Sequence, residues 1–120
     1  MHRFFGSHGK GECQKHKDML EQLVDRLCDK NYDLIATNIR YKVGKLEGEI
    51  DVLAVRDGVH HFYEIKSGKH RKSKAQDQYD RFRITHPRLK TRGIYVGRDS
   101  IQRLRGGIYD NTRGDYLDLQ

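Results

Sequence analysis

Two absences narrow the class of protein. No apolar run of signal-peptide length occurs in the first residues, MHRFFGSHGKGE, and no stretch of the 120 residues approaches a membrane span. There are only two cysteines, and one helix carrying Cys13 and Cys28 would separate them by about 22 Å, which is too far for a disulfide. We therefore expect an intracellular, cytoplasmic protein with free thiols and no membrane partner.

Several familiar ligand-binding patterns are missing as well. The seven histidines are scattered, and Cys13-x-x-His16 has no second pair at the spacing of a zinc site. No loop of the Gly-x-x-x-x-Gly-Lys-Ser type occurs, which argues against an ATPase. The chain also lacks internal repeats and low-complexity linkers. We therefore expect residues 1–120 to form a single domain with one modest core.

The charge is positive but unevenly distributed. The formal net charge is +7; residues 1–65 carry 10 Lys and Arg against 11 Asp and Glu, whereas residues 66–120 carry 14 against 6. Nearly all of the excess lies between Lys66 and Arg105. A one-sided basic field predicts a polyanionic partner, most simply nucleic acid. The alternative is a basic surface that only keeps the protein in solution.

The organising element of the sequence is a predicted β-hairpin. Two alternating apolar runs, Glu49–Val55 and Val59–Lys66, flank Asp57-Gly58, and Asp-Gly between such runs is the strongest short-range hairpin signal. A two-residue loop would place Asp51 directly opposite Glu64, on the same face of the hairpin. The other face is expected to carry Ile50, Val52, Ala54, His61, Tyr63 and Ile65.

Both faces of this hairpin are mostly apolar. We therefore expect it at the centre of a mixed sheet of four or more strands flanked by helices, which is an α/β fold. Opposed carboxylates in such a place repel each other, and their desolvation adds to the cost. A divalent cation removes both costs, and oxygen ligands suit magnesium or manganese. In the alternative interpretation Lys66, which shares this face, neutralises one carboxylate in an ion pair.

The order of these residues resembles a nuclease signature. Asp51, followed by Glu64-Ile65-Lys66 on the next strand, resembles the motif of the PD-(D/E)XK nuclease superfamily, with Ile50 where that motif has its proline. The resemblance covers about residues 10–97 and is nearest to archaeal Holliday-junction resolvases and recombination-helicase nucleases. It implies a restriction-endonuclease-like core in which Asp51, Glu64 and the backbone carbonyl of Ile65 bind Mg²⁺ or Mn²⁺. Lys66 would orient or deprotonate the attacking water, or stabilise the phosphate.

A first helix is predicted from Glu12 to about Lys30. Its apolar residues form one stripe, which includes Cys13, Leu20, Val24 and Leu27. Glu12 and His16 fall within or near this stripe and would face the sheet. The same superfamily commonly places a glutamate on its first helix, aimed at the metal, which implies a catalytic role for Glu12. Glu21 is the competing residue, and a third reading is that Glu12 only complements the helix N-terminus.

The segment after Lys66 is basic and leads into a second predicted helix. Its cations, for which phosphate contact is the expected role, are Lys69, Arg71, Lys72 and Lys74. The helix is predicted from about Ser73 to Thr85, with Gln76 one turn before Tyr79. Gln-x-x-Tyr here resembles a motif in the nuclease domains of bacterial recombination helicases, which implies that Gln76 supports nucleic-acid binding. A plain core role for Tyr79 fits the pattern equally well.

Three further elements complete the prediction. They are a strand over Asp33–Val43, a buried strand over Gly93–Gly97, and a short helix capped at Asp99 or Ser100 that runs through Leu104. Within the first of these strands, Ile35 and Ile39 should share one face. The remaining tail has no predicted role.

Together these features predict a metal-dependent deoxyribonuclease that uses Mg²⁺ or Mn²⁺ and has DNA as its partner. An endonuclease in DNA repair, recombination or processing is the first hypothesis, and RNA is left open as a substrate. A Holliday-junction resolvase acting as a homodimer is the nearest alternative, because one junction needs two active sites. A second alternative is a non-specific or mismatch-type endonuclease, or an exonuclease acting on ends, and a third is a catalytically silent nucleic-acid-binding module. The intact set of Asp51, Glu64 and Lys66 argues against silence.

Overall fold

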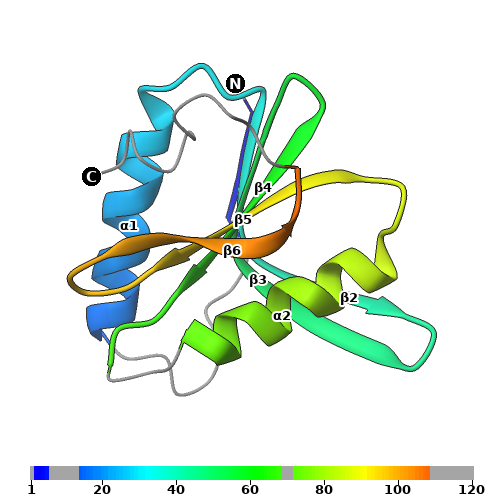
Figure 1. Cartoon of the computed structure of the whole chain (residues 1–120). Helices are drawn as coiled ribbons and strands as arrows, with labels where there is room; N and C mark the ends of the chain where they lie inside the picture. Colours follow the sequence, from blue (N-terminus) through cyan, green and yellow to red (C-terminus); the bar gives the residue numbers. More distant parts are fainter. Residues whose placement is uncertain (1, 6–13, 69–71, 109–120) are drawn as a thin grey trace.

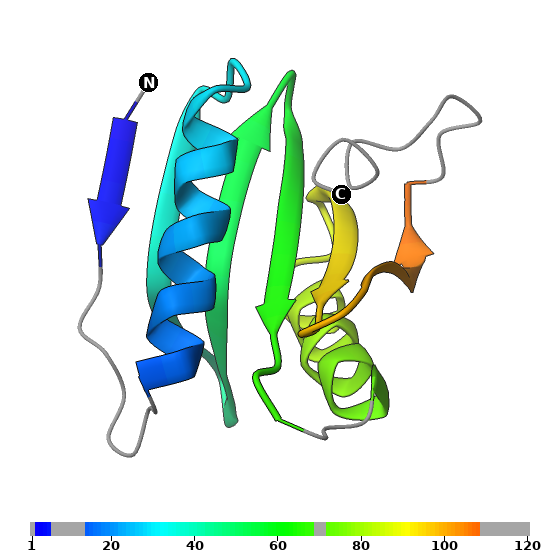
Figure 2. The same cartoon turned by 90° about the vertical axis from the view of Figure 1, so that its left-hand side faces the viewer.

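The protein folds as a mixed β-sheet with one helix on each face (Figures 1 and 2). The structure is a computed structural model that describes residues 2–5, 14–68 and 72–108. In chain order the elements are β1 (His2–Phe5), α1 (Gln14–Cys28), β2 (Leu34–Val43), β3 (Leu46–Arg56), β4 (Val59–Ile65), α2 (Lys72–Thr85), β5 (Lys90–Val96) and β6 (Ile101–Gly107). The described residues form six strands in the order β1-β2-β3-β4-β5-β6. β1 is parallel to β2 and β4 to β5, and the other neighbours are antiparallel. The expected α/β fold class is confirmed. Neither described helix is long and apolar enough to span a membrane.

The central hairpin of β3 and β4 has the predicted turn and register. Both residues of the Asp57-Gly58 loop have positive φ, 52° and 77°, as a two-residue type I′ turn requires. Paired residues then run from Arg56 and Val59 to Val52 and Tyr63. The hairpin lies in the middle of the sheet, between β2 and β5.

Each face of the sheet packs a hydrophobic core under one helix. The core under α1 contains Leu20, Leu23, Val24, Leu27, Tyr32, Ile35, Val52, Ala54, Tyr63, Ile65, Ile94 and Val96. The core under α2 contains Ile50, Phe62, Ala75, Tyr79, Phe82, Tyr95 and Leu104. Burying one large apolar side chain stabilises a fold by roughly 1.5–3 kcal/mol, so these two cores hold the helices against the sheet.

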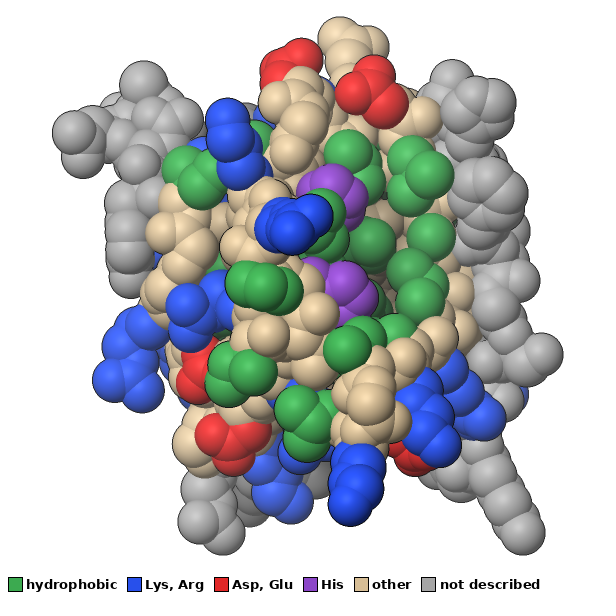
Figure 3. All heavy atoms as spheres, turned by 90° about the vertical axis from the view of Figure 1, so that its right-hand side faces the viewer, with side chains coloured by type: hydrophobic (Ala, Val, Ile, Leu, Met, Phe, Trp, Pro, Cys, Tyr) green, Lys and Arg blue, Asp and Glu red, His purple; other side chains and the backbone are tan. Residues whose placement is uncertain are grey.

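Helix α2 covers only part of its face. In Figure 3, which views the side opposite α1, apolar and histidine side chains gather in the middle, and most of the Lys and Arg side chains lie nearer the edges. Leu34, Leu53 and Val55 lie on this face and are half-buried. The covered part is nearer the end of the β2–β3 hairpin, where Ile39 and Tyr41 pack against the core under α2.

Strands β2 and β3 turn over partway along their length. Ile35 belongs to the core under α1, whereas Ile39 packs against the core under α2, so the predicted common face of these two residues is wrong. Between them, Asn38 has a φ of 50°, in the left-handed region that Asn adopts more readily than most residues. The pairing of β2 with β3 is interrupted at Asn38 and Asp51 and is regular on both sides of them.

Three other predictions need correction. Ile50 packs in the core under α2 and does not share the face of Val52, because β3 turns over at the same level as β2. The helix predicted through Leu104 is strand β6, since pairing with β5 outweighs a local helical spacing. The connecting turn is closed by a hydrogen bond from the N–H of Gly97 to the carbonyl of Ser100, at 2.8 Å. Helix α1 ends at Cys28, about two residues before its predicted end.

Candidate active site

Asp51 lies where β3 stops pairing with β4. Regular pairing ends at Val52 and Tyr63, one residue short of the direct Asp51–Glu64 pair that the sequence predicted. Instead, Oδ2 of Asp51 accepts a hydrogen bond of 2.8 Å from the backbone N–H of Ile65. The Asp51 side chain therefore connects the two strands at the level where their backbones no longer pair.

Glu64 is the most deeply buried charged group of the site. Its side chain is 9% exposed, and its Oε2 atom is buried without a hydrogen-bond partner among the described residues. Burial, and after it the negative charge of Asp51, raises the pKa of Glu64 to about 8, while Lys66 and His16 act in the opposite direction. A buried carboxylate beside a second carboxylate is the electrostatic setting that a bound cation relieves.

Lys66 lies at the entrance to the site. Its Nζ is 3.5 Å from Oε1 of Glu64, and its side chain is 21% exposed. Its backbone N–H donates a 3.0 Å hydrogen bond to the carbonyl of Val96, which fixes the end of β4 to the end of β5. The ammonium group therefore stays beside the carboxylates while remaining accessible from solvent.

Helix α1 contributes a residue that sequence reasoning did not assign to the site. Nε2 of His16 lies 3.4 Å from Oδ2 of Asp51, and both side chains are 18% exposed. The signal in the sequence was the position of His16 near the apolar stripe of its helix. An imidazole in this position can hold the Asp51 carboxylate in place.

The donor set suits a hard divalent cation. Mg²⁺ is commonly bound by one or two carboxylates and keeps several waters, and Asp51 and Glu64 provide two carboxylates, one with a buried oxygen that lacks a partner within the described ranges. In the part of the chain that the structure describes, no three His, Cys, Asp or Glu side chains gather into a metal-binding cluster. Carboxylate oxygens with water fit magnesium or manganese better than zinc, which prefers nitrogen and sulfur.

The other predicted site residues are only partly placed. Outside the described residues lie Glu12, Lys69 and Arg71. Glu21, the competitor of Glu12, is exposed on α1. Lys72 is half-buried and Lys74 is exposed, both at the start of α2. The structure thus brings together Asp51, Glu64 and Lys66, with Ile65 between the last two.

Gln76 has internal partners. Its Nε2 donates to Oδ1 of Asp80 and to the carbonyl of Arg105, each at 2.9 Å, and its Oε1 accepts from the backbone N–H of Arg105 at 2.8 Å. The side chain therefore ties α2 to β6. Tyr79 is buried in the core. A contact between Gln76 and nucleic acid stays a prediction.

Comparison with known proteins does not identify a family for the chain. No protein-family model matches the chain, and no curated protein matches it. One similar solved structure is a protein of unknown function, AF1548, which is 21% identical over 66% of this chain and 47% of that one, with a TM-score of 0.48. Another is SSO0001, which is 14% identical over 85% of this chain and 53% of that one, with a TM-score of 0.46. The chain thus spans about half the length of each of these two structures.

Proposed function

We propose that the protein is a metal-dependent deoxyribonuclease of the PD-(D/E)XK type, which hydrolyses phosphodiester bonds with Asp51, Glu64 and Lys66. The observation that carries this proposal is the buried Oε2 of Glu64, which has no hydrogen-bond partner among the described residues and belongs to a carboxylate next to a second one. An ion pair with Lys66 accounts for Oε1 of Glu64 but leaves Oε2 unexplained.

Each residue of the site has a chemical task in this proposal. Asp51 and Glu64 would hold Mg²⁺ or Mn²⁺, with the carbonyl of Ile65 as the further ligand that the resemblance implies. When bound, such a cation lowers the pKa of a coordinated water and stabilises negative charge on the phosphate. Lys66 can donate a hydrogen bond to the attacking water or to a phosphate oxygen, because its ammonium is partly exposed. His16 orients the Asp51 carboxylate.

Nucleic acid is the substrate class that the charge supports. The net charge is +7, and α2 begins soon after Lys66 with Lys72 and Lys74 in its first turn. The N-terminus of a helix favours anions, and its lysines add positive charge, so a phosphate backbone is well matched to this end of α2. DNA is the proposed substrate.

A cleavage panel tests the proposal. Plasmid DNA, single strands, flaps, four-way junctions and RNA would be incubated with Mg²⁺, Mn²⁺ or EDTA. We expect cleavage of DNA with either ion and none in EDTA, and loss of cleavage in Asp51→Asn and Glu64→Gln. Asp77→Asn, which removes an exposed carboxylate from α2, is the matched control and should cleave at the wild-type rate.

Each outcome of the panel has a defined meaning. Failure of the folded protein to cleave any substrate with either ion would contradict the proposal. Cleavage confined to four-way junctions, by a protein that is dimeric in solution, would select the resolvase. Full activity in either carboxylate variant would show that the active site lies elsewhere.

A further inference from the structure

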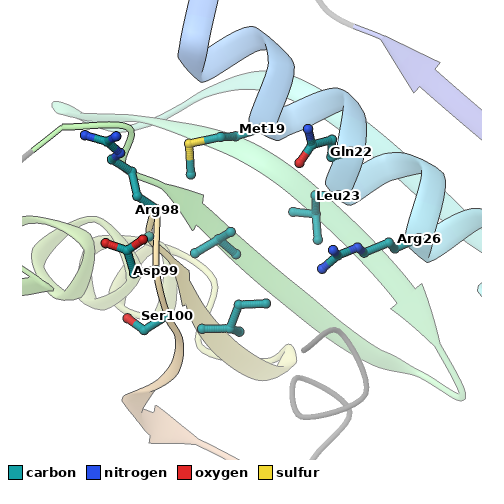
Figure 4. A pocket seen from close by; sticks show the side chains of 10 residues that line it. Met19, Gln22, Leu23, Arg26, Arg98, Asp99 and Ser100 are labelled. Atoms are coloured by element: carbon teal, nitrogen blue, oxygen red, sulfur yellow. The ribbon is translucent and has the colours of Figure 1, made fainter.

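A groove separates α1 from the turn between β5 and β6. It has a volume of about 510 Å³, a size typical of cavities that hold small molecules. Figure 4 shows Gln22 and Arg26 approaching it from α1, with Arg98, Asp99 and Ser100 on the opposite turn. Neither the proposed chemistry nor the predicted phosphate contacts use this groove.

The floor of the groove is apolar. Leu23 and Val96 are buried in the core under α1, and Met19 and Ile101 pack against that core from its edge. Apolar side chains, with the polarisable thioether of Met19 among them, offer contact to a flat aromatic ring but nothing to a phosphate. The floor therefore favours a ligand with an exposed apolar face.

The rim of the groove is polar and mostly basic. Arg26 and Arg98 are exposed on opposite walls. The rim therefore carries two guanidinium groups and one carboxylate, which belongs to Asp99. Guanidinium groups bind phosphate oxygens and also stack on rings. The amide of Gln22 and the carboxylate of Asp99 are the kinds of group that hydrogen-bond base edges. An apolar floor with such a rim is complementary to a nucleotide.

The groove lies next to the candidate active site. Val96, on its floor, accepts the backbone hydrogen bond of Lys66, and Met19 lies one helical turn after His16. Along α1, Arg26 is about 15 Å from His16, which equals roughly four stacked nucleotide steps. A strand that enters the site could therefore continue along the groove.

A second cleft lacks this complementarity. It has a volume of about 530 Å³ and lies between the β2–β3 hairpin and α2. Two of its cations are paired with carboxylates of the hairpin, because Arg40 lies 3.2 Å from Glu49 and Lys42 lies 3.6 Å from Glu47. The third, Arg81 of α2, donates a 2.9 Å hydrogen bond to the carbonyl of Glu47. The groove beside α1, with its apolar floor, is thus the better candidate for a nucleotide.

We propose that this groove binds unpaired nucleotides of the substrate strand, with a base on the apolar floor and the flanking phosphate on Arg98. The proposal rests on the nuclease function and adds to it a preference for DNA that is single-stranded beside the cleavage site. The physical reason is that a base exposes its flat faces only when it is unpaired and unstacked, and such stacking is largely independent of sequence. Duplex DNA would offer the groove only phosphates.

Binding measurements can separate this preference from the chemistry. Asp51→Asn protein in EDTA would be titrated, by fluorescence anisotropy, against a labelled oligothymidylate, an abasic oligonucleotide of equal length, and a duplex. We expect oligothymidylate to bind at least about tenfold more tightly than the abasic strand. Adding Arg98→Ala should weaken oligothymidylate binding about tenfold and duplex binding by less than twofold. Arg88→Ala removes an exposed arginine from the turn that precedes β5 and should weaken the binding of both probes by one small, equal factor.

Several results would overturn the inference. Equal affinity for oligothymidylate and the abasic strand would show that the groove recognises only anionic charge, and displacement of both by polyglutamate would agree with that. An equal effect of Arg98→Ala on single strand and duplex, or no effect on either, would place the substrate elsewhere. Any of these results, combined with intact ion-dependent cleavage by the wild-type protein, would leave the nuclease function standing. Absence of binding to all three probes would count against both.

Discussion

Oδ2 of Asp51 accepts the backbone hydrogen of Ile65 over 2.8 Å, and Ile65 is the residue between Glu64 and Lys66. This single bond therefore fixes Asp51 relative to both other members of the proposed site. It gives the carboxylate a structural task, which is to join β3 to β4 beyond their last regular pair, in addition to its charge. The two tasks can be separated by substitution, because an amide keeps an acceptor oxygen and loses the charge.

We predict different effects for two substitutions of Asp51. Asp51→Asn should abolish ion-dependent cleavage and leave the melting temperature within a few degrees of wild type. Asp51→Ala should also be inactive, and it should lower the free energy of unfolding by about 1–2 kcal/mol because the N–H of Ile65 loses its acceptor. Thermal melts and a cleavage assay on the same samples check this. Equal stability of the two variants would refute the structural task.

The pKa of Glu64 predicts how the stability of the metal-free protein depends on pH. Its ordinary value is 4.5 and its value in the folded chain is about 8, so between these values the folded chain keeps a proton that the unfolded chain has released. The contribution of this group is complete below the lower value and is lost as the pH rises through the upper one. In EDTA, the melting temperature should therefore fall between about pH 5 and pH 8.

Two variants and one ion check this pH dependence. Glu64→Gln should flatten the decline, since it has no proton to lose, whereas Glu21→Gln on the exposed side of α1 should keep the wild-type slope. Adding Mg²⁺ at about pH 8 should raise the melting temperature of wild type and not that of Asp51→Asn, because a ligand that binds only the folded state stabilises it. A wild-type slope in Glu64→Gln would rule out this explanation.

Lys66→Ala should separate catalysis from binding. We expect the cleavage rate to fall by about 100-fold or more, as is typical for a lost proton-transfer or positioning group. Duplex affinity should change by less than threefold, since other cations supply most of it. The logarithm of affinity should still fall with the logarithm of salt concentration, by about 0.9 per phosphate contact. Binding that does not respond to salt would contradict the electrostatic part of this prediction.

His16 and Glu12 are alternative candidates for the residue that supports the proposed metal site from the N-terminal part of the chain. His16→Gln should lower the cleavage rate by about 10–100-fold and raise the Mg²⁺ concentration needed for half-maximal activity, as is usual when a partner of a metal ligand is lost. Glu21→Gln should change neither quantity. Glu12→Gln tests the prediction drawn from sequence resemblance. A greater loss in Glu12→Gln than in His16→Gln would return the task to the glutamate.

The parts of the fold that sequence reasoning predicted correctly depend on local chemistry. Asp57-Gly58 determines the register of the central hairpin, because two successive positive φ angles select a two-residue loop, and the loop fixes the pairs from Arg56 and Val59 to Val52 and Tyr63. The apolar stripe of α1 likewise specifies which side of that helix faces the sheet.

The parts that were missed depend on contacts between distant segments. Ile101 and Leu104 have helical spacing, yet pairing with β5 makes their segment a strand. β1 pairs in parallel with β2, and such a pairing has no local signature in the sequence. A single Asn in a strand, such as Asn38, does not by itself indicate a left-handed backbone conformation. The point at which β2 and β3 turn over was therefore not predicted.

Because β2 and β3 turn over at Asn38 and Asp51, a cation bound there would couple the local unfolding of the two cores. On one side of Asn38 and Asp51, the fully buried residues Ile35, Val52 and Ala54 belong to the core under α1. On the other side, Ile50 belongs to the core under α2, and Ile39 and Tyr41 pack against that core. The core under α1 and the core under α2 can each unfold locally, with different free energies of opening. A cation held at Asp51 would bind at the boundary of both cores and would be lost if either opened. Amide hydrogens under α1 and under α2 should then slow their exchange with solvent by the same factor when the ion is added.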